Sequence, residues 1–165
     1  MQQKSKLRKK YLKIRRENYF EIDKKFFYPL LKLIKKNFKK KSIIIALYYP
    51  SNFELNVLKV LELKYFSHQT ILLPVIEKNN LMNFYQWKKN DVLTINKYGM
   101  LEPIKVEAKT PDIIILPLLA FDKDKYRLGY GKGYYDRYLN KFKKQYKKET
   151  MIVGVAFSFQ KNNKL

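Results

Sequence analysis

The chain of 165 residues contains no cysteine, is 46% hydrophobic and has a formal net charge of +22 at pH 7. Its length suits one domain over residues 1–165, and the lack of cysteine excludes disulfides and thiolate metal sites. No secretory signal and no apolar run long enough to cross a bilayer is visible, so we expect a cytoplasmic protein.

Helices are predicted at the start of the chain. Apolar residues at helical spacing predict a helix over residues 4–18 and a second helical region over 22–38. In the second region Pro29 either starts a new helix or kinks one, because proline removes a hydrogen bond from a helix interior. A third helix is predicted over residues 54–66, after a turn at 49–52.

Apolar runs of strand length separate these helices. They predict strands at 43–47, 70–75, 81–87, 112–116 and 151–155. Residues 92–111 are predicted to be mostly loop with a turn around Gly99, and a last helix is expected to end at about Tyr146. Strands that alternate with helices need crossover connections, so the pattern predicts an α/β fold whose sheet is at least partly parallel and covered on both faces. Ligands in such folds bind at the carboxyl ends of the strands.

Three of the chain's five glycines lie in the segment RLGYGKGYYDR, residues 127–137. Glycine is best used where another backbone or a ligand must approach closely, and this segment lies between an apolar strand and a helix start. That order can form a nest of free amides for phosphate oxygens, although a tight turn whose glycines serve packing is the alternative. The spacing fits neither a Walker loop, because Gly133 follows Lys132, nor the dinucleotide fingerprint, because Tyr134 stands at its third glycine.

The high positive charge has two interpretations. Clustered cations bind nucleic acids by releasing counterions, whereas lysines spread over every segment indicate a solvated surface. Lysine supplies 31 of the 36 cations, so arginine is the more informative cation. Of the five arginines, three fall in the segments of the predicted site: Arg8, Arg127 and Arg137. A planar guanidinium can hold a phosphate or carboxylate at two points, which favours a ligand role for them.

The segment PLLAFDKDKYRLGYGKGYYDRYL, residues 117–139, resembles the signature of the 5-formyltetrahydrofolate cyclo-ligase family. The resemblance extends to Lys4, Leu7 and Arg8, to the 51–56 turn, to Glu102 and Pro103, and to residues 154–157. It implies a single-domain, three-layer Rossmann-like fold with a mostly parallel (mixed) central sheet. It also implies conversion of 5-formyltetrahydrofolate to 5,10-methenyltetrahydrofolate with ATP and Mg2+. We expect a monomer whose partners are ATP and this folate, with no specific nucleic acid and no membrane.

The resemblance implies that the glycine segment binds ATP, with Arg127 and Lys132 as the catalytic cations. The implied ATP contacts are Lys4, Arg8, Arg127, Leu128, Gly129, Tyr130, Gly131, Lys132, Gly133, Tyr134 and Tyr135. Lys4 and Arg8 are four residues apart and so share a helix face, with a basic, frayed terminus as the alternative. Asp136 is expected to support magnesium, or else to be an ordinary first-turn acid that complements the helix dipole.

The implied substrate contacts are Glu54, Asn56, Tyr130 and Tyr134. The Glu54 carboxylate can accept two hydrogen bonds from the amino-pyrimidine edge of a pterin, unless it is only an early helix acid. Flat tyrosine rings suit a pterin as well.

Two features keep other functions open. Family members usually continue past residues 154–157 into a final strand, so we expect this chain to be short at its C-terminus and to lack a candidate for a second magnesium ligand. A nucleotide-binding protein without cyclo-ligase activity is therefore one alternative. A basic nucleic-acid-binding module is the other, because it would explain the charge.

Overall fold

The computed structural model describes residues 2–39, 42–145 and 149–165, and a five-stranded sheet lies at its centre. The strands lie in the order β3-β2-β1-β6-β9. Their bounds are Ile44–Ala46 for β1, Thr70–Ile76 for β2, Met82–Gln86 for β3, Ile113–Leu116 for β6 and Met151–Gly154 for β9. Parallel pairing joins β2 to β1, β1 to β6 and β6 to β9, whereas β3 is antiparallel to β2. The predicted mostly parallel, mixed sheet is confirmed.

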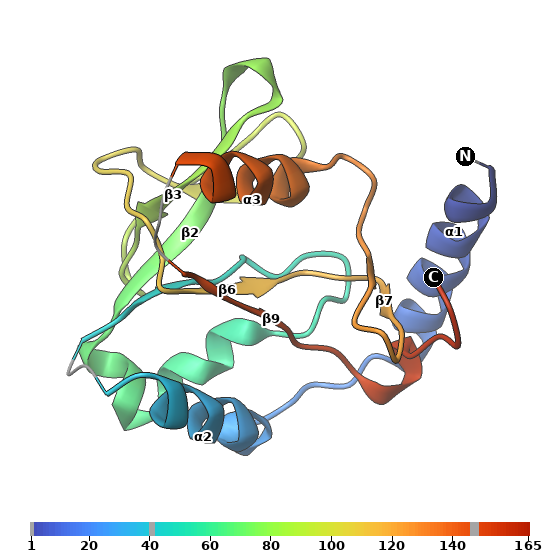
Figure 1. The fold of residues 1–165 in the computed structure, drawn as a ribbon, viewed down its shortest axis with the longest axis horizontal. Helices are drawn as coiled ribbons and strands as arrows, with labels where there is room; N and C mark the ends of the chain where they lie inside the picture. The colour runs from blue at the N-terminus through green and yellow to red at the C-terminus, as the bar shows by residue number, and fades with distance from the viewer. Residues whose placement is uncertain (1, 40–41, 146–148) are drawn as a thin grey trace.

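Helices cover both faces of this sheet, as Figure 1 shows. Helix α3 (Tyr134–Gln145) lies over one face and α2 (Tyr28–Asn37) over the other. Successive residues of a strand point to opposite faces, so Ile114 packs in the cluster beneath α3 while Ile113 and Ile115 pack in the larger cluster that includes Ile34 of α2. Short 3-10 helices complete that second layer: η1 (Lys24–Phe27), η2 (Val57–Glu62) and η3 (Lys64–His68). The predicted three-layer α/β fold is confirmed.

Helix α1 (Gln2–Asn18) lies beside the sheet and contacts the C-terminal segment. The Tyr11 hydroxyl donates to the carbonyl of Lys161 at 3.3 Å or to Oδ1 of Asn162 at 3.0 Å. A small apolar cluster adds Leu119, Ala120 and Leu128 from the hairpin of β7 (Ala120–Phe121) and β8 (Arg127–Leu128). This packing fixes α1 against the hairpin that leads into the glycine-rich segment.

The prediction of an α-helix over residues 54–66 is wrong, because the structure has the 3-10 helices η2 and η3 there, after an irregular turn. Between residues 57 and 68, the part that forms η2 and η3, the buried side chains are Val57, Val60, Leu63 and Phe66, at intervals of three residues. A 3-10 helix has three residues per turn and so aligns such residues on one face, whereas an α-helix would rotate them away from the core. The other predicted helices are confirmed, and in the second region a new helix, α2, starts at Tyr28 with Pro29 in its first turn. Tyr146, the expected end of the last helix, lies outside the described residues.

Two small hairpins were not expected from the sequence. Within the predicted loop 92–111, β4 (Leu93–Ile95) pairs with β5 (Leu101–Pro103) around a turn held by Asn96, whose Oδ1 accepts from the amides of Tyr98 and Met100. In the β7–β8 hairpin, Oδ1 of Asp122 accepts from the amides of Asp124 and Tyr126. Two further short helices, η4 (Lys78–Asn80) and η5 (Ser158–Gln160), connect elements elsewhere.

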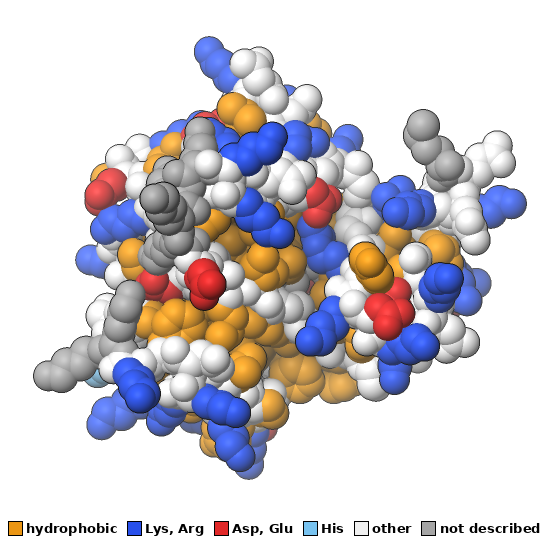
Figure 2. Space-filling view, viewed as in Figure 1, with side chains coloured by type: hydrophobic (Ala, Val, Ile, Leu, Met, Phe, Trp, Pro, Cys, Tyr) orange, Lys and Arg blue, Asp and Glu red, His pale blue; other side chains and the backbone are white. Residues whose placement is uncertain are grey.

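The surface carries basic side chains in many places. In Figure 2 they are scattered around the visible face, between apolar and uncharged groups, and do not form one continuous stripe. No helix within the described ranges has both the length and the apolar character needed to cross a membrane.

Gln160 provides a test of how the C-terminal segment is held. Its buried side chain accepts from the amide of Phe157 at 2.9 Å and donates to the carbonyls of Leu118 and Leu119 at 3.0 and 3.1 Å. Gln160→Ala leaves buried backbone groups without partners, so we expect the free energy of unfolding to fall by about 2–3 kcal/mol. Urea unfolding measures this, with Asn163→Ala, at an exposed position, as the control that should stay within about 0.5 kcal/mol. A loss at Gln160 as small as that control would contradict the account.

Candidate active site

A cavity of about 350 Å³ opens where the parallel strands end. Pro74 and Ile76 of β2 and Pro117, directly after β6, line it. The turn after β1 contributes Tyr48 and Glu54. The glycine-rich segment and the β4–β5 hairpin form the remaining walls: Tyr98, Met100, Leu101, Glu102, Arg127, Gly129, Tyr130, Gly131, Lys132, Gly133, Tyr134, Tyr135 and Asp136. The structure thus brings together the two segments that the sequence places at strand ends.

Arginine side chains lie directly against the glycine-rich segment. The Arg8 Nε donates to the carbonyl of Gly129 at 2.9 Å, and a Cβ built on Gly131 would lie 3.0 Å from the guanidinium carbon of Arg8. A Cβ on Gly133 would lie 2.9 Å from a guanidinium nitrogen of Arg137. Gly131 and Gly133 also have φ angles of +94° and +70°, which side chains rarely adopt. Glycine is therefore needed at both positions, because a side chain there would prevent the close approach of Arg8 and Arg137 to the backbone.

Arg127 carries the third guanidinium at this segment. Its Nη2 forms an ion pair of 2.6 Å with Asp136, its Nη1 donates to the carbonyl of Pro117 at 3.3 Å, and it lies over the Tyr135 ring at 5.8 Å. The Arg127 side chain is 18% exposed and that of Asp136 is 68% exposed. The arrangement fixes a cation at the cavity wall and leaves a carboxylate accessible beside it.

Lys132 contributes a cation of a different kind. Its ammonium group lies 5.3 Å from the centre of the Tyr98 ring, and no carboxylate of the described residues lies within ion-pair distance of it. Tyr98 lies at the tip of the β4–β5 hairpin, where the Tyr134 hydroxyl donates to the Tyr98 hydroxyl at 2.9 Å. The Lys132 charge is therefore available to an anionic ligand, close to an aromatic side chain.

Glu54 is a buried carboxylate in the wall of the cavity. It is 7% exposed, and its Oε2 accepts from the amide of Ser51 at 2.8 Å and from its hydroxyl at 3.3 Å. The Tyr130 hydroxyl donates to Oε1. Burial raises the pKa of the Glu54 carboxyl, while the hydrogen bonds from Tyr130 and Ser51 and the charge of Arg15 oppose that rise.

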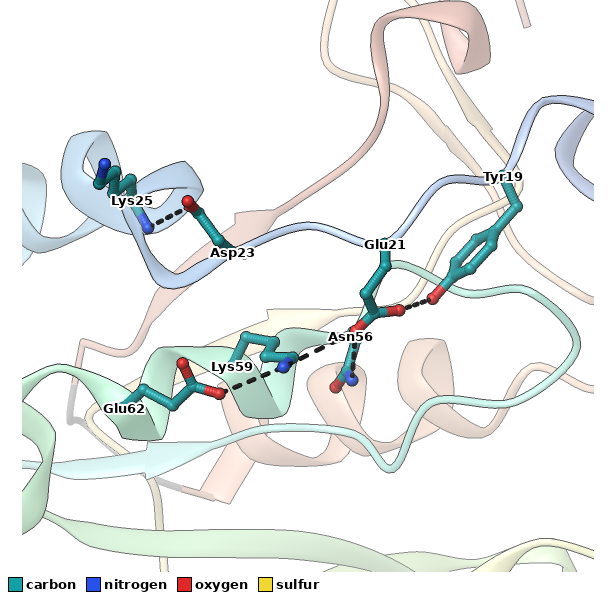
Figure 3. Close-up of polar contacts among 7 residues, drawn as sticks. All are labelled: Tyr19, Glu21, Asp23, Lys25, Asn56, Lys59 and Glu62. Carbon is teal, nitrogen blue, oxygen red and sulfur yellow. Dashed lines mark hydrogen bonds and ion pairs between the residues drawn. The ribbon is translucent and has the colours of Figure 1, made fainter.

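The predicted site residues are not all at the cavity. Leu128 is buried in the cluster under α1, and Lys4 is exposed on α1, one turn before Arg8. Asn56 does not line the cavity. Figure 3 shows its amide directed at Glu21, to which Nδ2 donates at 3.4 Å, in a polar group that also includes Lys59. The structure therefore does not bring Asn56 to the other predicted substrate contacts.

Arg15 was not predicted to lie at the site, although the scarcity of arginine in the chain pointed to it. Arg15 is one of only five arginines, and it lies two helical turns after Arg8 on α1. It is 1% exposed and donates to the Tyr130 hydroxyl at 2.6 Å. Tyr98 was also missed, because nothing in a predicted loop indicated that it would lie against Lys132.

No described group of three or more His, Asp and Glu side chains is arranged to hold a metal ion alone. Asp136 is the carboxylate nearest the cations of the glycine-rich segment, and it lines the cavity. Magnesium needs only one or two carboxylates when phosphate oxygens and waters supply the other ligands. The donor set therefore fits an ion that arrives with a phosphate ligand.

The chain is similar to known proteins in sequence and in fold. The model of the 5-formyltetrahydrofolate cyclo-ligase family matches residues 1–165. A probable 5-formyltetrahydrofolate cyclo-ligase of Schizosaccharomyces pombe is 35% identical over 104 residues, which are 56% of this chain. The aligned part spans about half, 51%, of that relative's length.

Two solved structures share the fold. A 5,10-methenyltetrahydrofolate synthetase of Aquifex aeolicus has a TM-score of 0.73 and 32% identity, covering 98% of this chain and 81% of its own. A 5,10-methenyltetrahydrofolate synthetase of Mycoplasma pneumoniae has a TM-score of 0.69 and 28% identity, covering 98% of this chain and 90% of its own.

Gly131 and Gly99 offer a matched pair for testing the close approach of Arg8. Both have positive φ angles, +94° and +76°, so alanine at either position should cost about 1 kcal/mol of backbone strain. Nothing lies within 4 Å of a Cβ at Gly99, whereas at Gly131 the Arg8 guanidinium must move and its bond to Gly129 is lost. We expect Gly131→Ala to lower the free energy of unfolding by roughly 1 kcal/mol more than Gly99→Ala, measured by urea unfolding. Equal losses at the two positions would show that the position of Arg8 does not require the absence of a Cβ at residue 131.

Proposed function

The chain belongs to the 5-formyltetrahydrofolate cyclo-ligase family, and from that premise we propose that it converts 5-formyltetrahydrofolate to 5,10-methenyltetrahydrofolate, with release of ADP and phosphate from ATP and the formyl oxygen. One observation carries the proposal. A single cavity is lined both by cations with glycine backbone and by a buried carboxylate. That polarity suits a triphosphate next to a heterocycle that carries N–H donors.

The phosphates of ATP would bind at the glycine-rich segment. Gly133 is followed directly by α3, and the free backbone N–H groups at a helix start bind anions well. Lys132 adds a charge without a carboxylate partner among the described residues, and Arg8 and Arg127 add planar guanidinium groups beside the same backbone. Lys4, one turn before Arg8 on the exposed side of α1, would contact the nucleotide at the outer rim.

The folate would bind at the Glu54 side of the cavity. The Glu54 carboxylate accepts N–H donors, and the rings of Tyr130 and Tyr134 line the space beside it. Ile76, Met82 and Met100 provide apolar walls for the pterin and the adjoining ring. Asn56 faces Glu21 in the free protein, so a substrate contact from it would require the turn to move.

The proposed reaction needs alignment of two substrates more than a protein nucleophile. The formyl oxygen attacks the γ-phosphorus of ATP, so an O–P bond forms and ADP leaves. N10 of the folate then attacks the activated formyl carbon, the C–O bond breaks, phosphate leaves with that oxygen, and the N10 proton is lost. Arg127 and Lys132 would neutralise charge on the phosphoryl group as it moves, and the cavity would hold both reactants in line.

Asp136 would hold magnesium, together with the ATP phosphates. The bound ion would reduce the negative charge of the phosphate oxygens. In the free protein Asp136 already holds Arg127 by an ion pair, so the carboxylate and the guanidinium are oriented toward the same part of the cavity.

The charge pattern gives little support to a nucleic-acid function. Basic side chains are dispersed over the face seen in Figure 2, whereas backbone binding favours a continuous basic surface. A monomeric state and a cytoplasmic location stay predictions, as does the interpretation of residues 1–165 as a single domain.

Substitutions at Lys132 and Arg127 test the proposed phosphate site. We expect Lys132→Ala and Arg127→Ala each to lower turnover by about 10²–10³-fold, because each removes a cation from the transferring phosphoryl group. The assay mixes protein, 5-formyltetrahydrofolate, ATP and magnesium and follows the methenyl chromophore and ADP together. Lys39→Ala is the control, because Lys39 is exposed and does not line the cavity. A loss at Lys39 comparable to that at Lys132, or full activity of both site variants, would contradict the proposed site.

A further inference from the structure

Arg15 is a buried cation that the proposed reaction does not use. It projects from α1 and is 1% exposed. Both of its hydrogen-bond partners belong to residues that line the cavity. Its Nη1 donates to the Tyr130 hydroxyl at 2.6 Å and its Nη2 to the carbonyl of Asn52 at 2.7 Å. Its Nε is buried without a hydrogen-bond partner among the described residues. Burying a guanidinium this incompletely satisfied costs stability, and apolar replacements of buried charges are often neutral or stabilising.

The contacts of Arg15 fix the direction of a chain of hydrogen bonds. A guanidinium can only donate, so the Tyr130 hydroxyl must accept from Arg15 and its single proton is left to donate to Glu54. The guanidinium carbon also lies 5.4 Å from the centre of the Tyr130 ring, which restrains that ring. Glu54 is thereby held from one side by Tyr130 and from the other by Ser51.

Counting acceptor positions shows what Glu54 still offers to a ligand. Oε2 receives both the amide and the hydroxyl of Ser51, while Oε1 receives only Tyr130. A carboxylate oxygen has two lone pairs. The two donors of Ser51 occupy both positions of Oε2, so the one acceptor position that is left is on Oε1. Glu54 and the Tyr130 hydroxyl together then present an acceptor to the cavity, because the Tyr130 proton is already engaged.

We propose that Arg15 is a positioning residue that determines specificity at this part of the cavity: acting through the Tyr130 hydroxyl, it keeps Glu54 oriented and ionised as a pure acceptor. The group recognised there is then an N–H edge of a heterocycle, and a ring that presents a carbonyl oxygen in its place is rejected. That the ligand is 5-formyltetrahydrofolate rests on the proposed function. The role of Arg15 toward Glu54 does not.

The groups around Glu54 predict how its titration responds. The titratable groups that act on it are Arg15 from α1, Tyr130 and Tyr135 from the glycine-rich segment and α3, and Tyr48 from the turn after β1. Burial raises the pKa of Glu54, and the positive charge of Arg15 lowers it. Removing that charge should therefore raise the pKa of Glu54 further. Since binding needs the carboxylate, it is lost as pH falls through this pKa, and a variant without Arg15 should lose binding at a higher pH.

The test compares Arg15→Gln and Arg15→Lys with Arg16→Gln, a matched change at the next residue of the same helix, which is exposed. The first measurement is the pKa of the Glu54 carboxyl in the ligand-free protein, by NMR titration. We expect an upward shift in Arg15→Gln, a smaller one in Arg15→Lys and none in Arg16→Gln. The second measurement is the Kd for 5-formyltetrahydrofolate and for ADP. Arg15→Gln should weaken folate binding about tenfold or more and ADP binding by no more than about twofold.

Tyr130→Phe keeps the ring and removes the hydroxyl through which Arg15 is proposed to act. Its effect on folate binding should not add to that of Arg15→Gln, because both break the same chain of hydrogen bonds. If Arg15→Gln does not fold, Arg15→Lys and Tyr130→Phe decide the matter by the same two measurements.

Three results would overturn the proposal. They are an unchanged Glu54 titration in the Arg15 variants, equal weakening of folate and ADP, and full additivity of the Arg15 and Tyr130 changes. A wild-type protein that binds no 5-formyltetrahydrofolate would overturn the proposed function instead, and the NMR titration would still decide the role of Arg15.

Discussion

The close approach of arginine side chains to a backbone without Cβ atoms is the constraint on which the site depends. Arg8 comes from α1, Arg127 from β8 and Arg137 from α3, yet all three lie against glycines of one short segment. A Cβ at Gly131 would lie 3.0 Å from the guanidinium carbon of Arg8, closer than ordinary van der Waals contact, on a backbone of positive φ. The packing of α1 on the C-terminal segment through Tyr11 therefore has a consequence for the site, because it holds Arg8 and Arg15 in place.

The electrostatic character of the cavity follows from the charges and hydrogen-bonding groups that each wall offers to a ligand. The glycine-rich segment offers backbone and cations, of which Lys132 has no carboxylate partner among the described residues. The turn after β1 offers Glu54, whose donors are Tyr130 and Ser51. A ligand with phosphate at one end and N–H donors at the other satisfies both walls, whereas a polyanion without such donors leaves the buried carboxylate without a ligand partner.

The sequence predicted the fold where apolar spacing was long and regular, as in α1, α2 and the four parallel strands. Prediction from the sequence failed where the structure depends on a single side-chain contact, either within a turn or between residues far apart in the sequence, or on a short 3-10 helix. Over residues 54–66 the apolar residues 55, 58, 60, 61 and 63 predict an α-helix, but the buried residues 57, 60, 63 and 66 follow a period of three and belong to two 3-10 helices and the residue between them. The β4–β5 hairpin depends on the Asn96 side chain, a contact that no hydrophobic pattern reports. At the site, the glycine cluster located the cavity correctly, but the burial of Arg15 depends on a partner 115 residues away.

The central claim is that the glycine-rich segment directs the terminal phosphate of ATP to a formyl oxygen. Isotope transfer tests it most directly. The protein is given 5-formyltetrahydrofolate labelled with ¹⁸O in the formyl group, together with ATP and magnesium, and the released phosphate is analysed by mass spectrometry. Our account predicts one ¹⁸O atom in the phosphate for each methenyl group formed. Unlabelled phosphate accompanying the methenyl product would contradict it.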